Sequence, residues 1–481
     1  MKFSINQIIS FGFVFHLLAA FYSIGHHHCD ELFQIFEFAG YKLQLNLASD
    51  LPWEFAANMR SGIQPFIVYT ITELFYFFGI NNPFHMAVFI RVLQALFSFF
   101  VIFKFLKVYE QKFASENIKK LLWIFGLLFW CMPYFHARFS SENFSASIFV
   151  MGLVLLFNSN KTILLRHYLF AGILFGLAFC IRFQIVFFLI GLGAWLICVQ
   201  KIKWKPMLLL SFGFMMALFV GYCSDAWLYN LNTLSWWNYL SENLFAGKAN
   251  QFGTSPFYFY FSETFLQLIP PFSLLLLAAF IFYFLKRPKN EISWICFPFI
   301  LLHILVPHKE LRFLFPLLYF MPIVFCEYMA HLNSDESKLK KIIQSKAFVN
   351  LSLVVNGILL IFFTLKPADD ETLIYKKIYD VVQGEQAILL YENRNPYNQQ
   401  AGLNYFRKPE IQTIDMAQKK ADLNNQNTYF FQDGFTEKDL IIKQSKVYVR
   451  VYSNFPNWIV YFNFNGWLQR ANVFSIYKCY K

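Results

Sequence analysis

The sequence predicts an α-helical protein that crosses a membrane many times and carries a small α/β domain at its carboxyl end. Of its 481 residues, 57% are hydrophobic and only 15% are charged, and the mean hydropathy is +0.42. One soluble core could not bury that much apolar surface. Phenylalanine-rich runs such as 97–103 and 280–285 are separated by short Lys/Arg clusters. This alternation is typical of membrane spans joined by loops.

Eleven windows carry the roughly 20 mostly apolar residues that a transmembrane helix needs. They lie near 5–24, 84–104, 121–135, 144–159, 167–183, 184–200, 206–223, 268–285, 293–307, 312–330 and 347–365. The first is long for a signal peptide and lacks a small-residue cleavage site. A further apolar stretch at 63–80 contains Pro65, and we expect a re-entrant or interfacial helix after that proline. Counting it as a span would place the lysine-rich 104–120 loop outside.

The lysines and arginines orient these spans. With a cytoplasmic amino terminus, every second loop is basic, as the positive-inside rule requires. Those basic residues are Lys104, Lys107, Lys112, Lys119, Lys120, Lys161, Arg166, Lys201, Lys203, Lys205, Lys286, Arg287, Lys289, Lys338, Lys340, Lys341 and Lys346. Loops 25–83, 136–143, 224–267 and 308–311 are then outside. The net charge of +12 is explained by topology and anionic lipid, so nucleic acid is not an expected partner.

The composition changes after Lys366, which divides the chain into a transmembrane domain at 1–366 and a small extracytoplasmic domain at 367–481. Alternating apolar residues predict strands and helices in this second part. We expect strands at 388–392, 429–432, 446–452 and 458–464, and helices at 371–382 and 397–406. The second domain has no recognisable catalytic motif. Eight scattered cysteines show no disulfide or zinc-finger spacing.

The loop that follows the first span begins with three histidines at 26–28 and then Cys29. If the next residues are helical, Asp30, Gln34 and Glu37 share one face. This predicts an amphipathic interfacial helix with an acidic edge, for which a merely solvated face is the alternative. Adjacent histidines cannot all face one ion, and the cysteine is not at finger spacing. We therefore expect no metal or other cofactor, although a divalent ion stays open.

Further charged and aromatic side chains gather in the outer loops and at the adjoining helix ends. They are Trp53, Glu54, Arg60, Arg138, Arg182, His308, Lys309, Glu310 and Arg312. Charges at membrane depth cost about 2.5–3.5 kcal/mol each, so they usually face a cavity. Arginine forks and a lysine point charge suit phosphate. The structural alternatives are an interfacial anchor for Trp53, a snorkelling Arg182 and a plain Lys309–Glu310 ion pair.

In chain order, these motifs resemble the signature of glycosyltransferase family 22, the mannosyltransferases of GPI-anchor and N-glycan assembly. The matching residues are Asp30-Glu31-Leu32-Phe33-Gln34, Trp53-Glu54, Arg60-Ser61, Arg138-Phe139-Ser140, Arg182, and His308-Lys309-Glu310 with Arg312-Phe313 and Pro316. The resemblance covers roughly residues 20 to 320. It implies a GT-C fold with about eleven transmembrane helices, whose first outer loop, 25–83, is catalytic.

The resemblance also implies a reaction: inverting transfer of mannose from a polyprenyl-phosphate-mannose donor to a lipid-linked or other glycan acceptor at the outer or lumenal face. A general base and phosphate-binding cations are what that chemistry needs. We expect Asp30 to be the base and Glu31 to orient the acceptor. The expected phosphate-binding residues are Lys309, Arg312, Arg60, Arg138 and Arg182. The expected substrate-binding residues are Gln34, Glu37, Trp53, Glu54, His308 and Glu310.

A compact chain rich in Phe, Lys and Asn suits a bacterial inner membrane, with the endoplasmic reticulum as the eukaryotic equivalent. Two other functions remain open. One is a GT-C enzyme for another lipid-phosphate sugar. The other is a transporter or flippase of lipid-linked sugars, which would carry charges near the bilayer midplane and paired broken helices.

Overall fold

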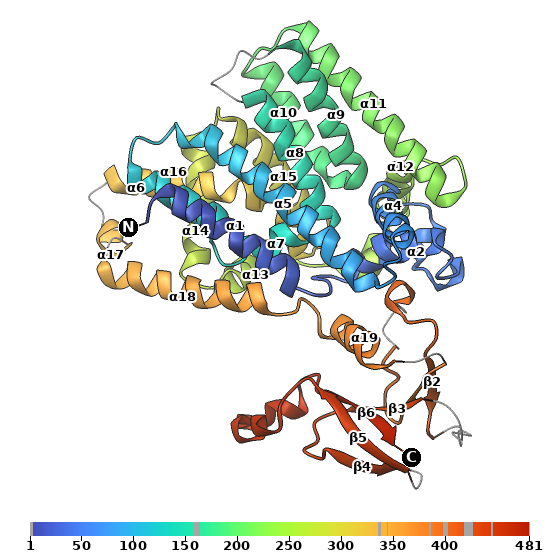
Figure 1. Cartoon of the computed structure of the whole chain (residues 1–481). Coiled ribbons are helices and arrows are strands. Elements are labelled where there is room, and N and C mark those ends of the chain that lie inside the picture. The colour runs from blue at the N-terminus through green and yellow to red at the C-terminus, as the bar shows by residue number, and fades with distance from the viewer. Residues whose placement is uncertain are drawn as a thin grey trace. The chain divides into compact units, whose positions relative to one another are not determined.

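A computed structural model describes residues 3–157, 164–334, 338–343, 345–383, 386–397, 403–417, 427–443 and 446–480 (Figure 1). The chain forms two compact units. The helical unit contains residues 1–23, 53–80 and 85–366, and the mixed unit contains 24–52, 81–84 and 367–481. Both units therefore take part of the outer loop expected at 25–83. Lys161, Lys481 and positions 398–402 of the helix expected at 397–406 lie outside the described residues.

Each of the eleven apolar windows contains helix. The helices of this part of the chain are α1 (Ile5–Tyr22), α3 (Trp53–Ala56), α4 (Ile63–Phe77), α5 (Pro83–Glu110), α6 (Glu116–Leu127), α7 (Met132–Ala137), α8 (Ser141–Phe157), α9 (Leu165–Ile181), η3 (Phe183–Ile185), α10 (Val186–Cys198), α11 (Trp204–Tyr229), α12 (Ser235–Leu240), η4 (Ser241–Phe245), η5 (Lys248–Phe252), α13 (Phe259–Gln267), α14 (Phe272–Lys286), α15 (Glu291–Leu305), η6 (Leu311–Tyr319), α16 (Met321–Ser334), α17 (Lys338–Ile343) and α18 (Lys346–Leu365). The window at 121–135 is two helices, α6 and α7, and not one. The stretch at 63–80 contains α4.

Among the described residues, four helices are long and apolar enough to cross a membrane by themselves: α1, α5, α11 and α18. The pair η6 and α16 forms a fifth candidate span that is bent by 66°. Five shorter apolar helices of 10–17 residues accompany them. Because large apolar side chains stay exposed along these helices, their outer surface suits lipid and not water.

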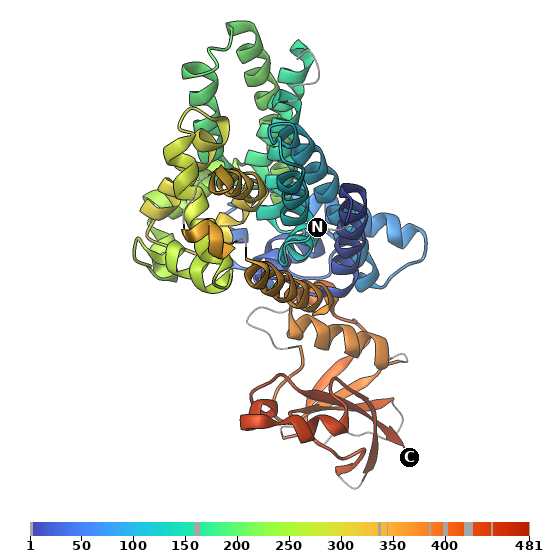
Figure 2. The same cartoon turned by 90° about the vertical axis from the view of Figure 1, so that its left-hand side faces the viewer.

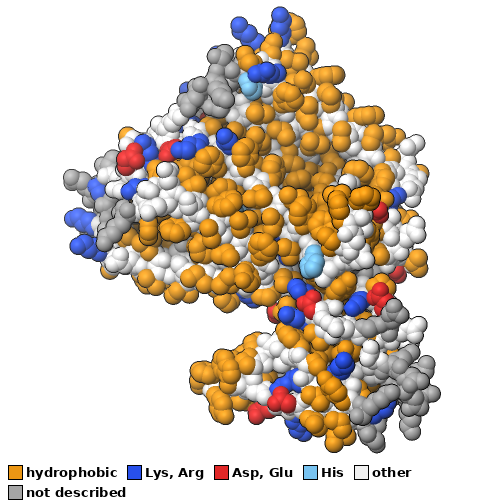
Figure 3. All heavy atoms as spheres, viewed as in Figure 1, with side chains coloured by type: hydrophobic (Ala, Val, Ile, Leu, Met, Phe, Trp, Pro, Cys, Tyr) orange, Lys and Arg blue, Asp and Glu red, His pale blue; other side chains and the backbone are white. Residues whose placement is uncertain are grey.

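That lipid-compatible surface is visible in Figure 3, where hydrophobic side chains cover most of the face shown of the helical unit. Its exposed members on α11 and α18 include Leu208, Phe212, Met215, Phe219, Leu351, Val354, Ile358 and Ile361. A soluble protein rarely exposes so continuous an apolar patch. The chain is an integral membrane protein.

Small residues bring α9 and α11 together, and the two helices run side by side in Figure 1. Gly172 and Gly176 of α9 repeat every four residues, as do Gly213, Ala217 and Gly221 of α11. A Cβ atom on Gly172 would lie 2.0 Å from the carbonyl oxygen of Leu210. Such small-residue faces let backbones approach closely in membrane proteins, where lipid offers no hydrophobic drive for helix association.

The mixed unit carries a six-stranded sheet, which Figure 2 shows from the side. Its strands are β1 (Ile388–Tyr391), β2 (Gln412–Asp415), β3 (Thr428–Asp433), β4 (Leu440–Lys443), β5 (Lys446–Ser453) and β6 (Phe474–Tyr480), in the order β2-β1-β3-β6-β5-β4. β1 runs parallel to β2 and β3, and the remaining pairs are antiparallel. Helix α19 (Asp370–Val381) precedes the sheet, and the Asp369 side chain caps it.

Three expected strands, at 388–392, 429–432 and 446–452, are confirmed, and so is the helix at 371–382. The strand expected at 458–464 is wrong, because η8 (Asn457–Phe462) and η9 (Phe464–Gln469) form 3₁₀ turns there. Strands β2, β4 and β6 were not predicted. The described end of the helix expected at 397–406 is a single 3₁₀ turn, η7 (Asn404–Phe406).

The first loop folds differently from the expected amphipathic helix. It forms a π-helical segment, η1 (Leu32–Glu37), followed by α2 (Phe38–Lys42). All residues from Gln34 to Gly40 are buried, so the expected exposed acidic edge is wrong. The reason is tertiary packing, because Phe36 lies against Tyr405 and Phe406, with ring centroids 5.3 and 5.5 Å away.

Candidate functional site

The helical unit holds a buried charged group at the ends of three helical segments. Glu142 lies in the first turn of α8, Arg182 follows α9, and Arg312 is near the start of η6. The Glu142 carboxylate is 3.0 Å from Nη1 of Arg182 and 3.2 Å from Nη1 of Arg312. Glu142 is only 3% exposed. One buried carboxylate therefore fixes two guanidinium groups that are 130 residues apart in sequence.

The short segment between α15 and η6 extends this group. The Glu310 carboxylate accepts hydrogen bonds from Nε of Arg312 at 2.5 Å and from its Nη2 at 3.2 Å. This is the forked geometry that arginine forms with carboxylates. His308 Nε2 is 3.0 Å from the same carboxylate, and its Nδ1 is 3.1 Å from the carbonyl oxygen of Gly253. Adjacent residues Lys309 and Glu310 do not pair, so the structural ion pair considered from the sequence is wrong.

Arg182 has donor capacity left over. Its Nη1 bonds to Glu142 and to Oγ of Ser141 at 3.0 Å. Its other terminal nitrogen, Nη2, is buried and has no hydrogen-bond partner in the part of the chain that the structure describes. The guanidinium also lies 5.4 Å from the ring centroid of Phe313. A buried N–H group without an acceptor is costly, so an acceptor from a ligand is an obvious complement.

Lys309 is a second buried cation of this group. Its ammonium donates to the carbonyl oxygens of Ser255 at 2.9 Å and Pro307 at 3.4 Å. Within the described residues it meets no carboxylate. Burial lowers the pKa of Lys309 below its ordinary value. Lys309 and the two arginines give three positive charges against two negative ones, so the group carries one positive charge in excess with histidine neutral.

A second polar group adjoins the first through aromatic and amide side chains. Arg60, just before α4, is 3.4 Å from the carboxylate of Glu54 and lies over the Tyr239 ring at 5.4 Å. The Tyr239 hydroxyl accepts from Gln184 at 2.7 Å. Both Arg60 and Arg312 lie close enough to Arg182 for their charges to repel it. The structure thus brings together four of the five arginines and lysines expected to bind phosphate, all except Arg138.

Trp53 stands beside this second group. Its ring stacks on Phe252 at a centroid distance of 6.0 Å, and the ammonium of Lys248 lies 5.0 Å from the ring centroid. These contacts make Trp53 part of an aromatic surface with a nearby cation, and not an isolated anchor.

Arg138 has a different environment from the other candidate cations. Its guanidinium donates to the carbonyl and hydroxyl oxygens of Ser23, the residue that ends α1. It also stacks over the Tyr134 ring at 5.3 Å. These contacts tie the end of α1 to the end of α7.

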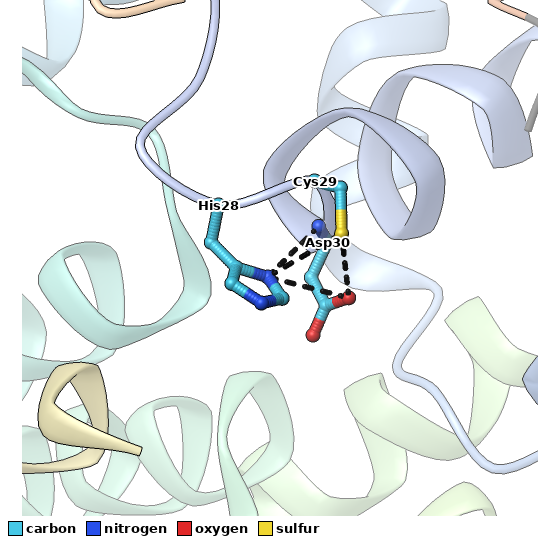
Figure 4. A group of neighbouring side chains, drawn as sticks. All are labelled: His28, Cys29 and Asp30. Atoms are coloured by element: carbon cyan, nitrogen blue, oxygen red, sulfur yellow. Dashed lines mark hydrogen bonds and ion pairs between the residues drawn. The ribbon is translucent and has the colours of Figure 1, made fainter. Parts of the chain in front are cut away.

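In the mixed unit, the side chains of His28, Cys29 and Asp30 converge (Figure 4). Nδ1 of His28 and Oδ1 of Asp30 are 3.5 Å apart. Asp30 starts the helical segment, and its backbone N–H donates to His28 Nδ1 at 3.3 Å. Glu31 is buried and accepts from the backbone N–H of His27 at 3.1 Å. The expected base and its neighbour are therefore held by a tight local turn.

Glu37 and Gln34 are buried in the same unit. The Glu37 carboxylate accepts from the Asn46 amide at 2.9 Å and from the backbone N–H groups of Asn404 and Tyr405, both at 3.0 Å. Burial raises the pKa of Glu37 to about 7, against these three hydrogen bonds, which lower it. Two of these hydrogen bonds join the first loop to residues 404–405.

Comparison with known proteins places the chain in a family. The model of the Alg9-like mannosyltransferase family matches residues 7–399. The chain belongs to the Alg9-like mannosyltransferase family. This confirms the resemblance to glycosyltransferase family 22 that the sequence motifs carry. A search among curated proteins finds no match.

Among solved structures, the chain is similar to ArnT from Cupriavidus metallidurans bound to undecaprenyl phosphate. The TM-score is 0.51 at 8% identity, and the match covers 98% of this chain and 97% of that one. At that identity the likeness shows the fold, which is GT-C. Family and fold together make this Alg9-like protein a membrane glycosyltransferase that uses a lipid-linked sugar.

Glu142 is not among the site residues expected from the sequence, although it is the centre of the buried charged group. Ser141, which accepts from Arg182, and Tyr239, which lies under Arg60, were also left out. Glu142 carried a usable signal, because a carboxylate in the first turn of an apolar helix at an outer loop is costly unless it has a partner. Nothing in the sequence around Tyr239 distinguishes it from other interfacial aromatic residues.

Proposed function

We propose that this Alg9-like protein transfers mannose from polyprenyl-phosphate mannose to a lipid-linked or other glycan acceptor, with inversion, on the extracytoplasmic or lumenal face. The family supports mannose as the sugar. A polyprenyl phosphate as the carrier is supported by the ligand of the similar structure, which is bound to undecaprenyl phosphate. Nucleotide sugars are cytoplasmic, so an outer site needs a lipid-borne donor.

One observation carries the phosphate part of this proposal: the charged group of the helical unit has a surplus of donors. Arg182 keeps a buried Nη2 without a partner among the described residues, and the Lys309 ammonium meets only carbonyl oxygens. Arginine and lysine donors in a poorly solvated site favour a phosphate oxyanion. When the glycosidic bond to phosphate breaks, negative charge grows on that phosphate, and fixed donors stabilise it.

Each residue of the candidate site has a proposed role in this reaction. Asp30 takes the proton of the acceptor hydroxyl, and Glu31 orients the acceptor. Lys309, Arg312, Arg182 and Arg60 hold the donor phosphate. In this scheme Arg138 positions α1 and does not bind phosphate, which narrows the set expected from the sequence.

Glu142 and Glu310 give the arginines their orientation, so that the guanidinium planes are preorganised before the donor binds. His308 extends this order through Glu310. Trp53 and Glu54 stay candidates for contacts with the sugar. Glu37 and Gln34, both buried, support the loop that carries Asp30.

The experiment is a transfer assay with purified protein in nanodiscs. Polyprenyl-phosphate mannose, polyprenyl-phosphate glucose and GDP-mannose are offered separately with a panel of glycolipid acceptors. We expect a mannosylated product and free polyprenyl phosphate in equal amounts with the first donor. Robust turnover with GDP-mannose alone, in membranes that lack polyprenyl-phosphate-mannose synthase, would overturn the proposal. Preference for glucose would favour the enzyme of another lipid-phosphate sugar, and lipid-linked sugar crossing liposomes without a new glycosidic bond would favour a flippase.

The proposed sidedness has its own test. We expect a cytoplasmic amino terminus and an outer carboxyl terminus, because every second loop is rich in lysine and arginine. A reporter that is active only in the cytoplasm, fused after the last residue, should stay silent, while the same reporter placed in the 104–120 loop should be active. An active carboxyl-terminal fusion contradicts the orientation.

A further inference from the structure

Three consecutive side chains at the start of the first loop point to a shared position in space. His28, Cys29 and Asp30 each offer one ligand atom, and these atoms all lie within 4.8 Å of one another. The separations are 3.5 Å from His28 Nδ1 to Asp30 Oδ1, 3.7 Å from Nδ1 to Cys29 Sγ, and 3.9 Å from Sγ to Oδ1. Figure 4 shows the three groups turned toward one another, with the second Asp30 oxygen directed away.

These separations are close to those that a tetrahedral zinc ion imposes. Zinc binds nitrogen and oxygen at about 2.0–2.1 Å and thiolate sulfur at about 2.3 Å. At tetrahedral angles, such bonds put ligand atoms roughly 3.3 Å apart for nitrogen and oxygen, and about 3.5–3.6 Å apart for each pair with sulfur. The observed triangle is larger by a few tenths of an ångström. Small side-chain rotations, which exchange the 3.3 Å hydrogen bond from the Asp30 N–H to His28 Nδ1 for a metal bond, would therefore close it around an ion.

The backbone holds this triangle in place. The N–H of Glu31 donates to the carbonyl of His28, and those of Leu32 and Phe33 donate to the carbonyl of Cys29, at 2.9–3.0 Å. These bonds begin the helical segment that buries the following residues. The three ligand atoms thus come from a turn and a helix start that are already ordered, which lowers the cost of binding an ion.

The surroundings suit a bound cation. The His28 and Asp30 side chains are 37% and 22% exposed, so the site is partly desolvated and still reachable. Cys29 belongs to no disulfide. The neighbouring His26 lies 3.5 Å from Asp369 instead of joining the group. A thiolate and a carboxylate balance a divalent charge, and an imidazole completes a donor set that selects a borderline metal over magnesium or calcium.

We propose that His28 Nδ1, Cys29 Sγ and Asp30 Oδ1 bind one divalent ion of the zinc type and leave its fourth position open. Three protein ligands with an open position are the arrangement of zinc sites that bind a water or a substrate oxygen. Binding releases the Cys29 thiol proton, so affinity rises with pH. The site stands independently of the proposed transfer reaction, although Asp30 belongs to both. It revises the expectation from the sequence that no metal binds here.

The test is metal binding by the full chain in detergent, purified through a peptide tag without histidine and stripped with EDTA. Competition against a chromophoric chelator gives the Zn²⁺ stoichiometry and affinity, and Co²⁺ reports thiolate ligation through its near-ultraviolet charge-transfer band. We expect one equivalent, and we expect Cys29→Ser to lose both the equivalent and the band. His28→Gln should weaken binding, whereas the matched controls His27→Gln and Cys223→Ser should bind as the unmodified chain does.

A measurement on the unmodified protein covers the case in which the variants fail to fold. Zn²⁺ should slow the alkylation of Cys29 by a maleimide, read by mass spectrometry, and leave unchanged the rate at half-buried Cys479, which lies in β6 outside the membrane-spanning helices. No saturable equivalent, or equal alkylation with and without Zn²⁺, overturns the site. If Zn²⁺ binds but no mannose is transferred, the proposed function fails and the metal site stands. If stripped protein that binds no Zn²⁺ still transfers mannose, the metal site fails and the proposed function stands.

Discussion

Two buried glutamates, one in each unit, are stabilised in different ways. Glu142 in the helical unit, 3% exposed, faces the guanidinium groups of Arg182 and Arg312. Glu37 in the mixed unit, 2% exposed, faces the amide of Asn46 and two backbone N–H groups. Charged guanidinium groups stabilise Glu142, whereas the dipoles of amide N–H groups stabilise Glu37.

The difference separates a charged site from an architectural joint. A carboxylate between two arginines orients donors that remain available on their other sides, as the unused Nη2 of Arg182 illustrates. The Glu37 carboxylate, by contrast, accepts three amide hydrogen bonds and orients no charged donor, and burial raises its pKa to about 7.

The largest effect is expected at Asp30, the proposed general base, in comparison with Glu37, which supports the same loop. Asp30→Asn keeps the shape of the side chain and abolishes proton acceptance, and loss of a general base costs roughly 10²–10⁴-fold in rate. Glu31→Gln should be intermediate and Glu37→Gln mildest, with mannose transfer measured in parallel at equal expression. If Asp30→Asn transfers mannose within a few-fold of the unmodified chain, the base is another group.

The second prediction concerns the two arginines around Glu142. Glu142→Gln removes the negative charge between buried cations, and removing one partner of a buried ion pair costs about 3–5 kcal/mol of stability. We expect a clearly lower unfolding midpoint in detergent. Glu310→Gln is the matched control, because the Glu310 side chain is 26% exposed and water screens its pairs. Equal losses in both variants would mean that burial of Glu142 adds nothing.

The composition of the chain made much of the fold predictable. Long apolar windows such as those of α1, α5 and α18 can only be buried in lipid or against other helices, so they were found. The break between α6 and α7 was not predicted, because residues 128–131 are as apolar as their neighbours. In the mixed unit, the aromatic run at 457–462 has high strand propensity. Asn465 and Gly466 have positive φ values and turn the chain nearby.

The candidate site could be predicted as residue types but not as contacts. Outer arginines and carboxylates were recognised because charge at a membrane face is costly. Their pairing depends on packing between segments far apart in the sequence, such as Glu142 with Arg312. Arg138 shows the limit, because its sequence context resembled that of the other candidate cations and its contacts are to the end of α1.

The third prediction concerns two cations of the charged group, Lys309 and Arg312. Lys309→Met and Arg312→Met each delete a donor to the departing phosphate, and loss of one such donor costs about 2.7–4 kcal/mol in the barrier, or 10²–10³-fold in rate. Because Lys309 meets only carbonyl oxygens among the described residues, its variant should stay stable, whereas Arg312→Met should also lower the unfolding midpoint. The exposed Lys205→Met is the control. Near-normal transfer by both variants would make the segment structural.

The smallest expected effect is a pH dependence that belongs to Glu37 alone. Its pKa is about 7 in the folded protein against an ordinary 4.5, so between these values the folded state binds more protons than the unfolded state. Stability should therefore fall as pH rises from about 4.5 to 7, by about 3 kcal/mol in total, and level off above pH 7.

Unfolding midpoints of the unmodified chain and of Glu37→Gln, followed from pH 4.5 to 8.5, measure this contribution. The difference between the two should change across the window, because glutamine does not titrate. Glu392→Gln, an exposed glutamate of the same unit that pairs with Lys443, should parallel the unmodified chain. If Glu37→Gln also parallels it, the folded-state pKa of Glu37 is close to its ordinary value, because the three hydrogen bonds offset the cost of burial. Hydrogen-bond donors would then keep Glu37 ionised at neutral pH, and the contrast with Glu142 would be one of partners and not of charge.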